Sequence, residues 1–99
     1  MEINELSKQL LQNLKEFIIN NDIEISNIEE LEINTRLIGT NSFFDSMDLV
    51  TFIVETEEFI LNDYNLEIQL ASEKALSRRT SPFLSILSLA KYIIELKNE

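Results

Sequence analysis

The residue of this sequence best placed to do chemistry is Ser46, which lies in the run Asp45-Ser46-Met47-Asp48. An aspartate followed three places on by a second acidic residue is typical of a capped helix start. Because Ser46 also follows a long irregular connection, its hydroxyl can be exposed. The unpaired N–H groups and the dipole of a helix start favour a phosphate attached there. Ser46 is therefore a candidate for covalent attachment of a phosphorylated group, and a plain helix-start serine is the competing interpretation.

Other kinds of chemistry are excluded by residue types that the chain lacks. It has no cysteine and no histidine, which excludes disulfides, thiolate or imidazole metal sites, a cysteine nucleophile and histidine-based triads. No pair of groups stands out as general acid and base. We therefore expect no metal site and no enzymatic activity.

The charge balance indicates the kind of partner. The chain has 8 basic and 18 acidic residues, a formal net charge of −10. Such a surface repels phosphate backbones, so we expect no nucleic acid partner. Anionic membrane surfaces are disfavoured for the same reason, and basic protein surfaces are the natural partners.

The length and composition favour one helical domain spanning residues 1–99. Hydrophobic residues make up 44% of the 99 residues, a proportion typical of globular proteins. A single glycine, Gly39, and a single proline, Pro82, are too few for the many turns of an all-β sandwich. We find no apolar run of the length that a membrane span needs and no signal-peptide pattern, and we expect a cytoplasmic monomer.

Apolar residues at steps of three and four predict the first and the last helix. The first runs from about residue 3 to Asn20-Asn21, and the last is capped by Ser85. The first stripe is Ile3, Leu6, Leu10, Leu14, Phe17 and Ile18, and the last is Ile86, Leu89, Ala90, Ile93, Ile94 and Leu96.

The second long helix is predicted from Ser46 to Asp63, and Asn65 is suited to the left-handed turn that ends it. Its expected inward face is Val50, Ile53, Val54, Ile60 and Leu61. Short helices are possible around residues 28–31 and at 72–76. We therefore predict an all-α fold, a small four-helix bundle of three longer helices and one short one. The expected core is Leu10, Leu14, Phe17, Val50, Ile53, Ile86, Leu89 and Ile93.

The stretch from Leu37 to Val50 resembles the phosphopantetheine attachment region of acyl carrier proteins. Asp45-Ser46-Met47 matches the Asp-Ser-Leu core of that family with methionine in place of leucine, and a leucine and a glycine stand upstream. The later segments that also resemble the family are Glu73-Lys74-Ala75-Leu76, Ser81-Pro82-Phe83 and Leu89-Ala90-Lys91-Tyr92-Ile93. The likeness extends over about residues 3–96. It departs from the family pattern at Asn41-Ser42, where glycines are frequent, at Phe43-Phe44, which is bulkier than usual, and at Asn65, which replaces a common glycine.

The resemblance implies a carrier that loads its cofactor with help from another enzyme. A phosphopantetheinyl transferase, acting with Mg²⁺ and coenzyme A, would attach 4'-phosphopantetheine to the oxygen of Ser46. The thiol of this arm would hold an acyl group as a thioester, so the chain needs no cysteine of its own. Enzymes that load and transfer acyl groups in lipid or specialised biosynthesis would then be the partners.

We expect the partner-binding residues to lie around and beyond Ser46, and we expect salt-sensitive docking to basic surfaces. They are Asp45, Met47, Asp48, Leu49, Glu55 and Glu58. Two alternatives stay open. The chain could carry aminoacyl or peptidyl groups, D-alanyl groups included, or it could be a non-catalytic acidic interaction protein whose serine only begins a helix.

Overall fold

The computed structural model describes residues 1–38, 44–72 and 81–99, and within these ranges the regular structure consists of three α-helices and one short 3₁₀ helix. They are α1 (Ile3–Asn20), η1 (Ile28–Glu30), α2 (Ser46–Tyr64) and α4 (Ile86–Lys97), and these described ranges contain no strand. The all-α prediction is confirmed. Most of the short helix predicted at 72–76 lies outside the described residues.

Helix α1 begins and ends where the sequence predicts. The Glu2 carboxylate accepts hydrogen bonds from the backbone N–H groups of Asn4 at 3.0 Å and Glu5 at 2.9 Å, which satisfies two of the unpaired donors of the first turn. At the other end the Asn21 side chain donates to the Phe17 carbonyl at 2.9 Å. Five of the six predicted stripe residues are buried, and Ile3 is partly buried.

Helices α2 and α4 have the predicted caps. The Asp45 carboxylate accepts from the Asp48 N–H at 2.8 Å, and Asn65 ends α2 in the left-handed conformation with φ 52° and ψ 40°. The Ser85 hydroxyl accepts from the Ser88 N–H at 3.1 Å at the start of α4. Both predicted helices are thus confirmed, and α2 extends one residue beyond Asp63.

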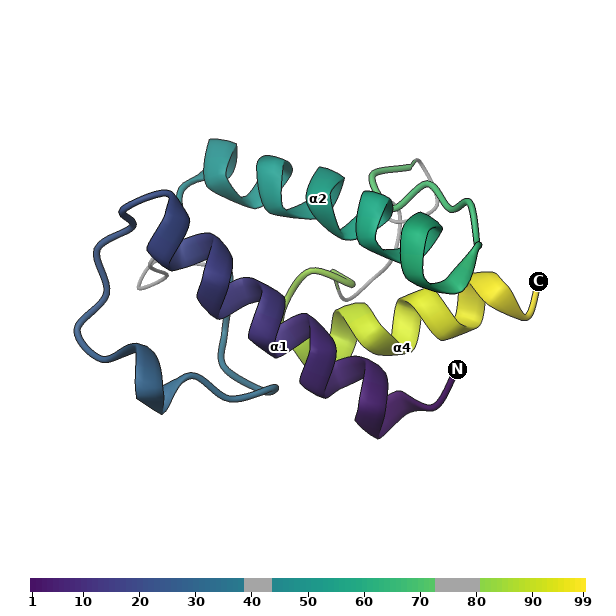
Figure 1. Cartoon of the computed structure of the whole chain (residues 1–99), viewed down its shortest axis with the longest axis horizontal. Helices are drawn as coiled ribbons and strands as arrows, with labels where there is room; N and C mark the ends of the chain where they lie inside the picture. The colour runs from purple at the N-terminus through teal and green to yellow at the C-terminus, as the bar shows by residue number, and fades with distance from the viewer. Residues whose placement is uncertain (39–43, 73–80) are drawn as a thin grey trace.

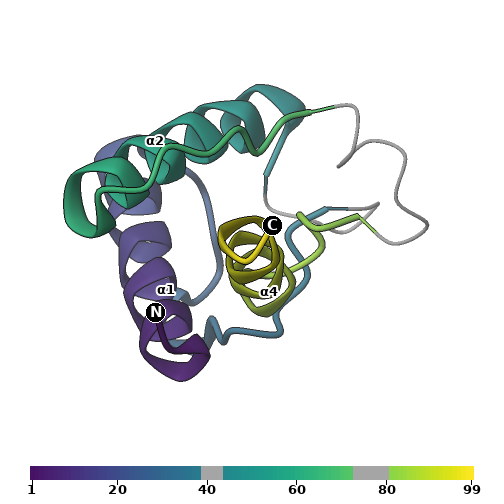
Figure 2. The ribbon, with the colours of Figure 1, turned by 90° about the vertical axis from the view of Figure 1, so that its right-hand side faces the viewer.

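The three helices enclose a shared apolar core (Figures 1 and 2). Helix α1 packs against both α4 and α2, more extensively against α4. Seven of the eight predicted core residues are buried, and the exception is Val50. The core also includes residues that the stripes did not single out: Phe44, Phe52, Leu70, Phe83 and Tyr92.

The predicted inward face of α2 is wrong at three of its five positions. Val50, Val54 and Leu61 are 58%, 47% and 46% exposed. The buried face consists of Phe52, Ile53, Thr56 and Ile60. Helix α2 carries apolar residues on two faces, so the sequence offers two stripes at helical spacing. Thr56 interrupts the buried one, yet its hydroxyl is satisfied by donating to the Phe52 carbonyl at 2.8 Å.

The connection between α1 and α2 is held to the segment around the start of α4. The Leu37 N–H donates to the Leu84 carbonyl and the Leu87 N–H donates to the Ile33 carbonyl, both at 2.8 Å. Leu31 and Leu37 are buried in the core. Residues 31–37 of this connection therefore lie against the core formed by the helices. Across the described part of the chain, no helix has the length and apolar character needed to span a membrane.

Candidate functional site

Ser46 is the first residue of α2, and it is exposed. The residue before it, Asp45, is extended, and its carboxylate closes the first turn by accepting from the Asp48 N–H. The first helical backbone bond, from the Leu49 N–H to the Asp45 carbonyl, measures 3.1 Å. Ser46 itself has no part in capping, because Asp45 fills that role. Its hydroxyl is thus available for other chemistry.

The position of this helix start is fixed from inside by Phe44, two residues before Ser46. The Phe44 ring is buried and meets the Phe17 ring of α1 edge-on, with 5.8 Å between centroids. It also lies 6.0 Å from the Phe52 ring of α2, which is 5.6 Å from that of Phe17. Phe44 thereby ties the chain just before Ser46 to two helices, while Asp45, Ser46 and Met47 remain exposed.

The charge around the serine is negative. Asp45 is exposed and Asp48 is partly exposed, both within one helical turn of Ser46. These two carboxylates disfavour a further negative charge, whereas the dipole and the unpaired N–H groups of the first turn of α2 favour an anion at this end. With no histidine in the chain, an imidazole base to activate the serine is ruled out. The arrangement therefore presents a hydroxyl that an external catalyst can modify.

A stripe of exposed side chains runs along α2 from the residue after Ser46. Its members are Met47, Val50, Val54, Glu58 and Leu61, at successive steps of three and four residues. We call this stripe the outer face of α2. Met47 is 78% exposed, the most of the four apolar members. An exposed stripe of apolar side chains with one carboxylate among them is typical of a protein-binding surface.

The other predicted partner-binding residues lie around this face. Glu58 belongs to it, and Asp45 and Asp48 lie at its serine end. Leu49 is half-buried against the core, so less of it is available to a partner. Glu55 is exposed on the flank of α2 that faces α1, beside a groove.

Sequence reasoning assigned Val50, Val54 and Leu61 to the core and so missed their place on the outer face. A sign was present in the sequence, because these residues continue the helical spacing of Met47, which was already a docking candidate. The role of Phe44 as a buried anchor was also missed. Its bulk was noted only as a departure from the acyl carrier pattern.

Comparisons with protein-family models, with curated proteins and with solved structures find no match to this chain. The functional argument therefore depends on the chain's own residues and geometry.

Proposed function

We propose that this chain is a carrier protein of the acyl carrier type, which receives a 4'-phosphopantetheine arm on Ser46 and carries acyl groups on it. One observation carries the proposal. Ser46 is an exposed serine at the start of a long helix, capped by the aspartate that precedes it and held in place by buried Phe44. The sequence around it, Asp45-Ser46-Met47, resembles the attachment motif of such carriers.

The residues around Ser46 suit the arm. In the attachment reaction the Ser46 Oγ forms a bond to the phosphorus that bears pantetheine as the pyrophosphate bond of coenzyme A breaks. The adenosine 3',5'-bisphosphate leaves, and the hydroxyl proton passes to a base that the transferase supplies. The new phosphodiester would lie beside the first turn of α2, where a negative charge gains about 0.3–1 kcal/mol at an exposed site. This gain is too small to select one serine, so the transferase must supply the recognition. The terminal thiol of the arm supplies the thioester chemistry.

The outer face of α2 supports the same proposal because it begins directly beside the serine. A partner enzyme that reaches the arm would cover Met47 and Val50, and its basic residues would meet Asp48 and Glu58. Apolar contact would supply affinity, and the exposed carboxylates would mainly raise the association rate. The chain would present its cargo and leave catalysis to the partner.

Intact-mass spectrometry tests the proposal. The purified chain is incubated with a broad-specificity phosphopantetheinyl transferase, Mg²⁺ and coenzyme A. We expect the wild type to gain the mass of one arm and Ser46→Ala to gain none. Ser26→Ala is the matched control, because Ser26 is also an exposed serine, and it should load as the wild type does. Loading of Ser46→Ala, or no loading of the wild type by any competent transferase, would refute the proposal.

Two other functions can be distinguished from the proposed one by experiment. A carrier of aminoacyl or peptidyl groups would use the same serine, and mass analysis of the thioester on protein from its native host distinguishes it. A non-catalytic interaction protein is favoured by one observation, since the outer face of α2 is exposed and apolar whether or not Ser46 is modified. That function follows if the chain never accepts the arm.

A further inference from the structure

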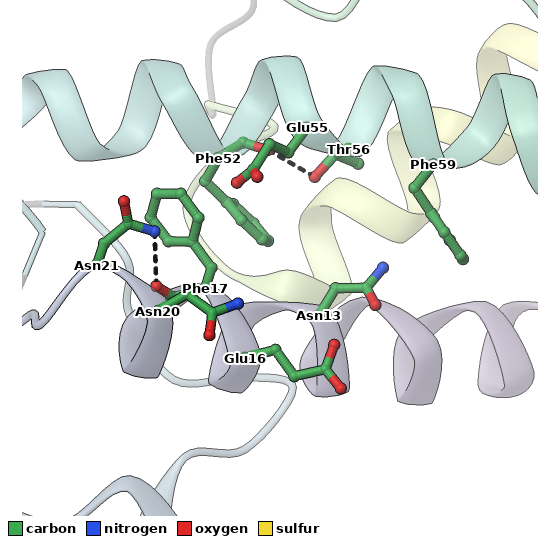
Figure 3. Close-up of a pocket in the computed structure, with 9 residues that line it drawn as sticks. All are labelled: Asn13, Glu16, Phe17, Asn20, Asn21, Phe52, Glu55, Thr56 and Phe59. Atoms are coloured by element: carbon green, nitrogen blue, oxygen red, sulfur yellow. Dashed lines mark hydrogen bonds between the residues drawn. The ribbon is translucent and has the colours of Figure 1, made fainter.

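A groove of about 220 Å³ lies between the second half of α1 and the middle of α2 (Figure 3). Side chains from both helices line it, and it is separate from the outer face. Its lining combines three aromatic rings, two carboxylates, three carboxamides and one threonine: Phe17, Phe52, Phe59, Glu16, Glu55, Asn13, Asn20, Asn21 and Thr56. None of the described residues that line it is basic.

We infer that this groove receives an arginine side chain of a partner protein. Glu16 contributes a carboxylate from α1 and Glu55 contributes one from α2, and both residues are exposed. Neither has a salt bridge to any residue in the described ranges; Glu16 has only a 3.5 Å hydrogen bond from Gln12. With a net charge of −10 on the chain, the complementary ligand is a cation.

The other groups of the groove favour a guanidinium over an ammonium. Arginine has five N–H donors in a plane and stacks on aromatic rings, whereas lysine is a more strongly hydrated point charge. The lining is rich in acceptors. Asn21 already donates its amide to the Phe17 carbonyl and keeps its side-chain oxygen. Phe59 is half-buried, so part of its ring can contact the apolar stem of an arginine.

A metal ion fits the groove less well. The affinity of a calcium site depends on the number of charged ligands as well as on neutral oxygens, and two carboxylates are present among the described residues of the lining. Within the described ranges no group of three acidic, histidine or cysteine side chains is placed to hold a metal.

The position of the groove points to a protein as the source of the cation. Phe52 lies six residues after Ser46, about 9 Å along the helix axis. Phe52 itself is buried, but the exposed Glu55 of the groove lies about one turn further along α2. A protein interface of ordinary size, about 800 Å² per partner, is large enough to cover both the serine and this part of the groove. This step rests on the proposed function, because a carrier must dock to enzymes that act at Ser46.

An NMR titration of the unmodified chain tests the inference. The probe is N-acetyl-arginine methylamide, an arginine with a neutral backbone, and the matched compound is its uncharged citrulline analogue. We expect saturable shifts of the Asn13, Asn20 and Asn21 side-chain amides with the arginine compound and much smaller shifts with citrulline. Glu16→Gln or Glu55→Gln should weaken binding about two- to fivefold, the range expected for the loss of one exposed ion pair. Glu67→Gln, at an exposed site outside both the groove and the outer face, should leave it unchanged.

Three outcomes would overturn the inference. Equal shifts with citrulline would show that charge is not recognised, and equal weakening by Glu67→Gln would show a diffuse field effect. Tighter binding of free L-arginine than of the blocked residue would indicate a small-molecule site, because a partner's arginine has no α-carboxylate. The titration needs no arm, so it can fail while Ser46 loads, and Ser46 can fail to load while the groove binds arginine.

Discussion

The Phe44 ring meets the Phe17 ring at an interplanar angle of 90°, and this contact joins the chain just before Ser46 to the last turn of α1. Edge-to-face pairs of this kind contribute about 0.5–1.5 kcal/mol beyond the burial of their surface. The contact also explains why three exposed residues can directly follow a buried one. The exposed segment that contains Ser46 is thus held by a residue of the core.

Replacement of Phe44 by alanine should therefore weaken both stability and presentation of the serine. We expect a loss of about 3–5 kcal/mol in the free energy of unfolding, since the change removes a buried ring. Urea denaturation followed by circular dichroism measures it. Phe44→Leu keeps most of the volume and should lose markedly less. A loss below about 1 kcal/mol in the alanine variant would contradict the anchoring role.

Substitutions of Asp45 separate capping from charge. Asp45→Ala removes the acceptor of the Asp48 N–H and should cost about 1 kcal/mol of stability. Asp45→Asn keeps an acceptor oxygen, so its free energy of unfolding should stay near that of the wild type. If a transferase recognises the Asp45 charge, both variants should load more slowly. Normal loading of Asp45→Asn would restrict Asp45 to a structural role.

The two faces of α2 should respond differently to truncation. Ile53→Ala creates a cavity in the core and should cost about 2–5 kcal/mol. Val50→Ala removes methyl groups that are mostly in water, and it should change stability by no more than about 0.5 kcal/mol. If the proposed function is right, the transferase contacts Val50 on the outer face, and Val50→Ala should therefore raise the KM of the transferase for the chain. Strong destabilisation by Val50→Ala would restore Val50 to the core.

Reversal of Glu58 to lysine should slow association with a basic partner enzyme, because the exposed carboxylate contributes to a long-range attractive field. Stopped-flow association rates at increasing salt measure the effect. The wild-type rate should fall with salt, and the rates of variant and wild type should converge as the field is screened. Glu67→Lys, at an exposed site outside α2, changes the net charge by the same amount and is the control for net charge. Rates indifferent to both salt and Glu58→Lys would indicate purely apolar docking.

The hydroxyl of Tyr64 donates to the Gln9 side-chain oxygen and links the end of α2 to α1. Burial raises the pKa of Tyr64 above its ordinary value of 10.0, and the nearby negative charges of Glu5 and Asp63 raise it further. The neutral phenol is thus favoured in the folded state. Its contribution to stability is complete below pH 10 and is lost as the pH rises from there through the folded pKa.

Urea denaturation across this alkaline range tests the effect. The free energy of unfolding should fall more steeply with pH in the wild type than in Tyr64→Phe, which has no phenol to titrate at this site. The two proteins differ at residue 64 alone, so a difference between their curves is due to Tyr64. Parallel curves would contradict the raised pKa of Tyr64.

Much of the local structure was determined by the sequence itself. The start and end of α1, the Asp45 and Ser85 caps and the left-handed Asn65 depend on interactions within one or two turns of the chain. Such interactions act between neighbours in sequence, so residue type and spacing are enough to predict them. The exposed setting of Ser46 at the start of a helix followed in the same way.

The tertiary structure alone decided which face of α2 is buried and what lies beneath Ser46. Helix α2 has two apolar stripes at helical spacing, and the spacing alone does not predict which of them is buried. The choice depends on the rings that α1 and Phe44 present, because Phe52 packs with Phe17 and Phe44 and so turns Val50 and Val54 outward. The groove between Glu16 and Glu55 likewise joins residues far apart in the sequence, and only the packing of α1 on α2 brings them together.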